Sequence, residues 1–158
     1  MLLWLIFLKV NRLKNNLLNN FLNTIKDKHI AFAGISRSNL PLIKIFLEHG
    51  IHTTVCDTST SDSTQTTANS LKNLGAKILL GKDYLSGVNP DILFRTPGIN
   101  FLNPDIIKLK ESGVVITSEM EIFFDLCPCM IIAVTGSDGK TTTTTLISKI
   151  LEKANKTV

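Results

Sequence analysis

The chain has 158 residues, of which 44% are hydrophobic and 19% charged, and its formal net charge at pH 7 is +4. This composition excludes a disordered chain, and only three cysteines exclude a disulfide-stapled scaffold. The positive surplus is too small and too scattered to indicate a nucleic-acid-binding protein. The length allows one domain, or one domain and part of a second.

The first 28 residues differ in amino-acid composition from the rest of the chain. Residues 1–10 are apolar but less than half as long as the roughly 20 residues of a membrane span. A stretch with basic residues follows this apolar run, whereas in a signal peptide the basic residues precede the apolar run. We therefore expect an extension without stable membrane association. Residues 11–28 carry leucine, phenylalanine and isoleucine at helical spacing, which predicts an amphipathic helix.

From residue 29 onward, short apolar runs alternate with helix-like segments. Strands are predicted over residues 29–33, 51–56, 76–80, 91–94, 114–116 and 130–134. Helices are predicted over residues 40–49, 104–111 and 140–153. A fourth helix is expected to follow a Ser/Thr-rich loop at 58–67 and to end at residue 74. A fifth is expected to begin at Ser118, where Glu121 completes a capping-box pattern. This alternation predicts an α/β fold, a Rossmann-like parallel sheet with helices on both faces. A further strand, loop and helix follow that sheet.

The strongest functional signal is the run Gly-Ser-Asp-Gly-Lys-Thr between the last predicted strand and the last helix. Its glycines let phosphate oxygens approach backbone N–H groups, and the helix start adds partial positive charge. Lys140 adds a full charge for the β/γ-phosphates, and the Thr141 hydroxyl is a ligand for Mg²⁺. The spacing is two residues shorter than the common P-loop form, and a turn without a ligand is the alternative. The predicted phosphate-binding residues are Gly136, Ser137, Asp138, Gly139, Lys140, Thr141 and Thr142.

The first strand leads into Gly-Ile-Ser-Arg-Ser-Asn, residues 34–39, where a Rossmann glycine fingerprint would stand. Only its first glycine is present, which argues against ordinary NAD binding. Ser38, Asn39 and the free amides of the helix start can still hold a diphosphate, and Arg37 can pair with it. The alternative is a plain strand–helix turn.

Two further loops follow predicted strands at the same edge of the sheet. Asp57 lies about 20 residues past the first loop, where an acid commonly accepts hydrogen bonds from a ribose or a base edge. The alternative is an exposed turn aspartate. Residues 95–100, Arg-Thr-Pro-Gly-Ile-Asn, place a rigid Pro-Gly turn after the fourth strand. Their alignment with the first loop favours contact with one ligand.

Together these motifs resemble the Mur ligases, and in particular the members that add D-glutamate. The resemblance covers about residues 28–158 and rests on four stretches: 34–39, Val-Cys-Asp-Thr at 55–58, Thr-Pro-Gly-Ile at 96–99, and 135–141. It implies an N-terminal extension and helix over 1–28, a domain for the uridine diphosphate of the substrate over 29–128, and the truncated start of a central ATPase domain over 129–158. The implied substrate-binding residues are Ser36, Arg37, Ser38, Asp57, Thr58, Thr96, Pro97 and Gly98.

The resemblance also implies a reaction. Such ligases use ATP and Mg²⁺ to activate the carboxylate of UDP-N-acetylmuramoyl-L-alanine as an acyl phosphate, which the amine of D-glutamate then attacks. Lys140 and Thr141 would be the catalytic residues, with Thr141 on the Mg²⁺. This chemistry belongs to cytoplasmic peptidoglycan precursor synthesis, needs no nucleic acid, and is expected of a monomer when the protein is complete. Since the chain is about a third of the family's usual length, the resemblance implies an N-terminal fragment that is inactive alone.

Other classes of protein share parts of this pattern. The phosphate loop alone fits any member of the Mur ligase superfamily, including folylpolyglutamate synthases. A non-catalytic nucleotide-binding module would need the same loops. A small NAD-dependent oxidoreductase with a degraded fingerprint is the third alternative, and Ser36 and Asn39 in place of glycines speak against it.

Overall fold

The computed structural model describes residues 13–156, and the chain divides into two compact units. Residues 16–126 form the larger unit, and residues 127–156 lie in the other. The expectations for residues 1–10 fall outside the described part of the chain. Among the described helices, none is long and apolar enough to cross a membrane.

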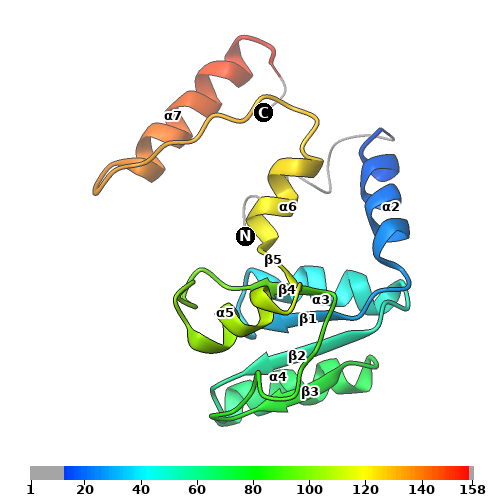
Figure 1. The fold of residues 1–158 in the computed structure, drawn as a ribbon. Helices are drawn as coiled ribbons and strands as arrows, with labels where there is room; N and C mark the ends of the chain where they lie inside the picture. Colours follow the sequence, from blue (N-terminus) through cyan, green and yellow to red (C-terminus); the bar gives the residue numbers. More distant parts are fainter. Residues whose placement is uncertain (1–12, 157–158) are drawn as a thin grey trace. The chain divides into compact units, whose positions relative to one another are not determined.

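The larger unit is built on a five-stranded parallel sheet (Figure 1). Its strands are β1 (Ile30–Ala33), β2 (Thr53–Asp57), β3 (Lys77–Leu80), β4 (Ile92–Arg95) and β5 (Val115–Thr117). Their spatial order is β3-β2-β1-β4-β5, and β1 pairs with both β2 and β4. This confirms the predicted Rossmann-like α/β fold. Strand order reverses beside β1, and in such sheets ligands bind at that switch point, outside the carboxyl ends of the strands.

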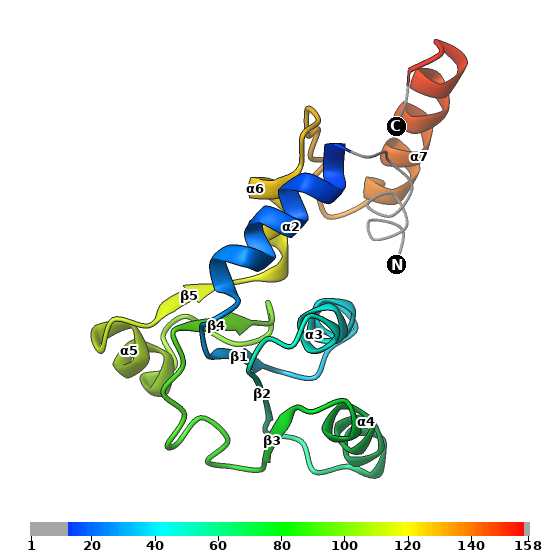
Figure 2. The ribbon, with the colours of Figure 1, turned by 90° about the vertical axis from the view of Figure 1, so that its right-hand side faces the viewer.

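Helices cover both faces of the sheet, as predicted. The helices are α2 (Leu13–Ile25), α3 (Asn39–Glu48), α4 (Asp62–Asn73), α5 (Pro104–Glu111) and α6 (Glu119–Leu126). Figure 2 shows α3 and α4 on one side of the strands and α5 on the other. Successive β1 residues alternate between two cores: Phe32 packs with α2, α3 and α4, whereas Ala33 faces α5. The amphipathic helix predicted over 11–28 contributes Leu22 and Ile25 to the first of these cores.

One helix begins earlier than its sequence predicts. Residues 58–67 were expected to form a loop because they are rich in serine and threonine, yet α4 starts at Asp62. Ser61 caps this helix, since its hydroxyl accepts a hydrogen bond from the Thr64 amide. Further along, the Thr66 and Thr67 hydroxyls donate to carbonyls four residues earlier, so the polar side chains are satisfied within the helix.

The connection from β3 to β4, residues 81–91, contains no helix. It folds as turns along the α5 face of the sheet and buries Tyr84, Leu85 and Val88 there. This path carries the chain from the edge strand β3 to the opposite side of β1, where β4 pairs.

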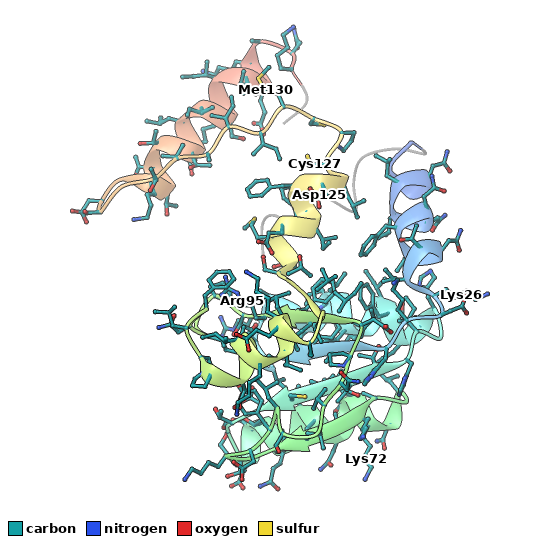
Figure 3. All side chains as sticks on the ribbon, viewed as in Figure 1. Lys26, Lys72, Arg95, Asp125, Cys127 and Met130 are labelled. Carbon is teal, nitrogen blue, oxygen red and sulfur yellow. The ribbon has the colours of Figure 1, made fainter. Side chains whose placement is uncertain are left out.

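In the second unit the predicted helix is confirmed and the predicted strand is wrong. Helix α7 covers Lys140–Lys153, as expected. Residues 130–134 pair with no described strand, and the side chains of Met130 and Ile132 are 90% and 61% exposed. Figure 3 labels Met130 on the extended segment that leads to α7. A parallel strand exists only through hydrogen bonds to neighbours, and the described residues of this unit supply none.

Candidate functional site

A cavity of about 420 Å³ lies within the larger unit, at the carboxyl ends of β1, β2 and β4. It is open to solvent on one side, and four connections of the chain contribute to its wall. The lining residues are Gly34, Ile35, Ser36, Asp57, Thr58, Tyr84, Thr96, Gly98, Ile99, Asn100 and Asn103. Its position at the switch point of the sheet is where a nucleotide is expected to bind.

Gly34 allows two of these connections to approach each other closely. Its φ of +98° is a conformation that other residues rarely adopt, and an added Cβ would lie 2.7 Å from Cγ2 of Thr96. The Thr96 amide in turn donates to the carbonyl of Ala33, just before the glycine. A glycine at residue 34 is therefore required for the first and third loops to share one cavity.

Asp57 ties the first loop to the second. One carboxylate oxygen, Oδ2, accepts a hydrogen bond from the amide of Ile35 at 2.6 Å, and Oδ1 accepts one from the amide of Ser59 at 2.8 Å. Each oxygen keeps a second lone pair, so the carboxylate can still accept from a ligand hydroxyl. Asp57 thus shapes the cavity wall as well as lining it.

The start of α3 holds a small polar network. The hydroxyls of Ser36 and Ser38 lie 2.8 Å apart, and the Asn39 side-chain amide donates to the carbonyl of Gly34. Asn39 is 1% exposed, and its Oδ1 is buried without a hydrogen-bond partner among the described residues. Ser38, at the N-cap position of α3, makes no side-chain capping bond. The sequence predicted free amides at this helix start, and that expectation is wrong: the Asn39 and Leu40 amides donate to the hydroxyl and the carbonyl of Ser36, and Pro41 has no amide hydrogen.

Arg95 fixes the conformation of the Pro-Gly loop (Figure 3). Its guanidinium donates to the carbonyl of Ile99 at 3.0 Å and lies 3.3 Å from the ring centroid of Phe101. These contacts close the loop over residues 96–101 on its own strand. Sequence reasoning gave Arg95 no role, because the signal lies in a loop-closing contact rather than in a motif.

The cavity brings together five of the eight predicted substrate-binding residues: Ser36, Asp57, Thr58, Thr96 and Gly98. The other three, Arg37, Ser38 and Pro97, belong to the same loops but do not line it. Tyr84 and Asn103 line the cavity without having been predicted. Asn103 carries a sequence signal, since an Asn-Pro pair marks a helix start. Tyr84 carries none, because only the helix-free path from β3 to β4 brings it there.

The predicted phosphate loop lies in the second unit and is exposed. Gly139 has a φ of +75° at the N-cap of α7, where no side chain caps the helix. The ammonium group of Lys140 donates to the carbonyls of Gly136 and Ser137, so it folds back over its own loop. The uncapped helix start and the Lys140 ammonium both adjoin the loop of residues 136–139, and this combination of amide donors and positive charge fits phosphate oxygens. For a metal, the described residues offer no cluster of three or more His, Cys, Asp or Glu side chains.

Comparison with known proteins decides the family. The chain is 47% identical over 140 residues to the UDP-N-acetylmuramoylalanine–D-glutamate ligase of Ruminiclostridium cellulolyticum, a match that covers 88% of the chain and 30% of the relative. It is 43% identical over 134 residues to the ligase of that name from Clostridium novyi. The chain belongs to the Mur ligase family. It spans about 30% of the length of these Mur ligases.

Solved structures of Mur ligases share the fold. The UDP-N-acetylmuramate–alanine ligase MurC of Thermotoga maritima aligns with a TM-score of 0.51 at 24% identity, over 81% of the chain and 30% of its own length. The murein peptide ligase Mpl of Psychrobacter arcticus aligns with a TM-score of 0.53, also at 24% identity, over 81% of the chain and 27% of its own length. At this identity the likeness concerns the fold alone. No protein-family model matches the chain.

Proposed function

We propose that the chain is the substrate-recognition part of an ATP-dependent ligase that adds D-glutamate to UDP-N-acetylmuramoyl-L-alanine. The observation that carries the proposal is the cavity, which gathers Ser36, Asp57, Thr58, Thr96 and Gly98 from three separate loops of the resemblance. The 40–47% identity to ligases with this activity supports it. Synthesis of such a nucleotide-linked precursor takes place in the cytoplasm, which is the location we propose.

In this proposal the start of α3 holds the substrate diphosphate. The dipole of α3 attracts anionic oxygens to this end of the helix, and the Ser36 hydroxyl lies in the cavity wall there. Arg37 is exposed on the same loop and can approach the diphosphate from solvent. Asp57 and Thr58 then face the nucleoside, and the Pro-Gly loop after β4 faces the far side of the diphosphate.

The second unit would hold ATP at residues 136–142. Gly136, Gly139 and the first-turn amides of α7 would contact the phosphates, Lys140 would neutralise their charge, and the Thr141 hydroxyl would be one ligand of Mg²⁺. When bound, ATP supplies the phosphoryl group that activates the substrate carboxylate. The chain's own contribution is positioning and charge neutralisation, which dominate catalysis of phosphoryl transfer.

Calorimetry with UDP-N-acetylmuramoyl-L-alanine tests the first half of the proposal on the 158-residue chain. We expect measurable but weak binding, and phosphate release from ATP at the level of a protein-free control. Absence of any heat of binding at millimolar ligand would contradict the assignment of the cavity. ATP turnover by the chain alone would contradict the expected inactivity of the fragment.

Lys140→Ala tests the second half, in a chain completed with the remaining sequence of a D-glutamate-adding relative. We expect loss of ligase turnover, because removing a cation at a transferring phosphoryl group costs several kcal/mol, of the order of 3 kcal/mol or more. Affinity for the uridine nucleotide should stay unchanged, because its cavity lies within residues 16–126. Turnover within threefold of the unmodified enzyme would overturn the role of Lys140.

A further inference from the structure

Tyr84 has a side chain that is almost buried and yet reaches the cavity. It is 7% exposed, and its ring belongs to the apolar cluster that also contains Ala33, Cys56 and Ile106. It is held near the end of β2, because the Tyr84 amide donates to the carbonyl of Gly81 and the Gly81 amide donates to the carbonyl of Asp57. Tyr84 is also one of the residues that line the cavity.

The hydroxyl group of Tyr84 has no hydrogen-bond partner among the described residues. A buried tyrosine hydroxyl usually has one. Within the described chain, the only side-chain oxygen or nitrogen that is fully buried without a partner is Oδ1 of Asn39. The Tyr84 hydroxyl is therefore not sealed in the core, and the cavity that its residue lines is the space it meets.

The charges around this phenol keep it protonated. Burial raises the pKa of Tyr84, and the nearby carboxylates of Asp57 and Asp105 and the Cys56 thiol raise it further. The group is thus a neutral O–H at physiological pH, able to donate a hydrogen bond into the cavity. A phenol held in a packed ring position donates in a fixed direction, which suits recognition of one particular atom.

The strand order indicates which part of a ligand this donor meets. Asp57 and Thr58 follow β2, and the hydrogen bonds through Gly81 hold Tyr84 near the end of β2, so they lie on one side of the loop after β1. Thr96 and Gly98 follow β4, on the other side. In a sheet of this kind the diphosphate lies at the first helix and the acid after β2 faces the ribose. The side that carries Tyr84 is therefore the nucleoside side.

We propose that the Tyr84 hydroxyl donates a hydrogen bond to an oxygen of the nucleoside, on its ribose or its base, and so contributes to selection of the nucleotide. This inference rests on the proposed function, because it takes the ligand of the cavity to be a uridine diphosphate. It assigns a specificity role to a connection that carries no motif.

Tyr84→Phe tests the inference in the 158-residue chain, since phenylalanine keeps the packed ring and removes only the hydroxyl. Affinity for UDP should fall roughly three- to tenfold, the range expected for one hydrogen bond to a ligand. Inorganic pyrophosphate, measured as a competitor of UDP, lacks the nucleoside and should compete equally well with both proteins. Ser86→Ala is the matched control, because it removes an exposed hydroxyl that does not line the cavity from the same connection.

The outcomes separate the two proposals. Equal affinity of wild type and Tyr84→Phe for UDP, with normal melting curves, would overturn the role of Tyr84 and leave the proposed function standing. An equal loss for UDP and for pyrophosphate would also overturn it, since the phenol would then contact the phosphates. Failure of the wild-type chain to bind UDP at all would overturn the proposed function, and this inference with it.

Discussion

The two units of the chain differ in how far they bury their apolar side chains. In the larger unit, Phe32, Phe46 and Phe94 are completely buried and contact one another, with the rings of Phe32 and Phe94 stacked at 4.8 Å. In residues 127–156, Ile132, Leu146 and Ile150 are each more than half exposed. Both regions contain sequence that is typical of a buried strand, but only one of them forms a sheet.

The difference shows what each kind of sequence signal depends on. Helix α7 forms over its predicted residues because helical hydrogen bonds close within the segment. The run at 130–134 has no strand beside it among residues 13–156, so its apolar and β-branched residues form no sheet there. The same comparison applies to the two candidate sites, since the cavity is held by paired strands and the phosphate loop by a single helix.

The largest contrast should be in thiol reactivity. Cys56 is completely buried, and burial raises its pKa from 9.0 to about 12. At pH 8 its thiolate is then about a thousandfold scarcer than that of an ordinary cysteine. Iodoacetamide should modify the exposed Cys129 at least a thousandfold faster than Cys56, as measured by mass spectrometry of peptides. Comparable rates would mean that the sheet opens readily.

The same shift gives stability a pH dependence. The unfolded thiol titrates near pH 9 and the folded one near pH 12, so between these values the folded state binds the proton more tightly. The contribution to stability is complete below pH 9 and declines as the pH rises toward 12. Cys56→Ala should show a smaller decline over that interval than wild type in urea melts.

The next largest difference between the units is expected in how much the truncation of an apolar side chain lowers the free energy of unfolding. Phe32→Ala removes a fully buried ring between two other rings and should lower the free energy of unfolding by about 3–5 kcal/mol. Ile132→Ala, at a 61% exposed position, should change it by less than about 0.5 kcal/mol. Urea denaturation followed by circular dichroism measures both. A large effect of Ile132→Ala would show that this side chain is covered in solution.

A smaller effect is expected where two loops meet at the cavity. Gly34→Ala should destabilise the chain by about 2 kcal/mol, from the positive φ and from the clash with Thr96. Gly50→Ala is the control, since Gly50 has a φ of +70° with nothing within 4 Å of an added Cβ. In the double variant with Thr96→Ala, the excess of Gly34→Ala over Gly50→Ala should shrink. Equal effects of both glycine substitutions would remove the close approach as the reason for Gly34.

The smallest expected effect concerns the cap of α4. Ser61→Ala removes the hydroxyl that accepts from the Thr64 amide and should cost about 1 kcal/mol. Ser70→Ala, within the same helix, removes a hydroxyl that only donates to the carbonyl of Thr66 and should be nearly neutral. Thermal unfolding of the two variants gives the comparison. Equal melting temperatures would argue against a capping role for Ser61.

Much of the fold could be predicted because most of its signals are local. Five strands and the helix over 104–111 follow from apolar runs, a proline at the helix start and glycines at helix ends. The start of α4 was missed because serine and threonine signal loops unless their hydroxyls find partners inside the helix, as Thr66 does. The prediction of a strand over residues 130–134 was wrong because the sequence pattern does not report whether a neighbouring strand exists.

The candidate site was predictable to the extent that it consists of motifs. Asp57 and Thr96 belong to loops that end strands, and the parallel order alone places such loops at one edge. Tyr84 reaches the cavity only because the connection after β3 crosses the sheet without a helix, and no sequence pattern encodes that path. The two amides bound by Asp57 were also beyond prediction, because both belong to loop conformations.

The wall of the cavity comes from four connections that are separated by up to about 70 residues of chain and joined only through the sheet. The binding surface therefore exists only while the whole sheet is intact, and an unfolded chain retains no part of it. Ligand binding must then raise the unfolding free energy of residues 16–126 as one block, by about 2.7 kcal/mol at a ligand concentration 100 times the dissociation constant. A rise in melting temperature with uridine nucleotide concentration would serve as a binding measurement that requires no catalytic turnover.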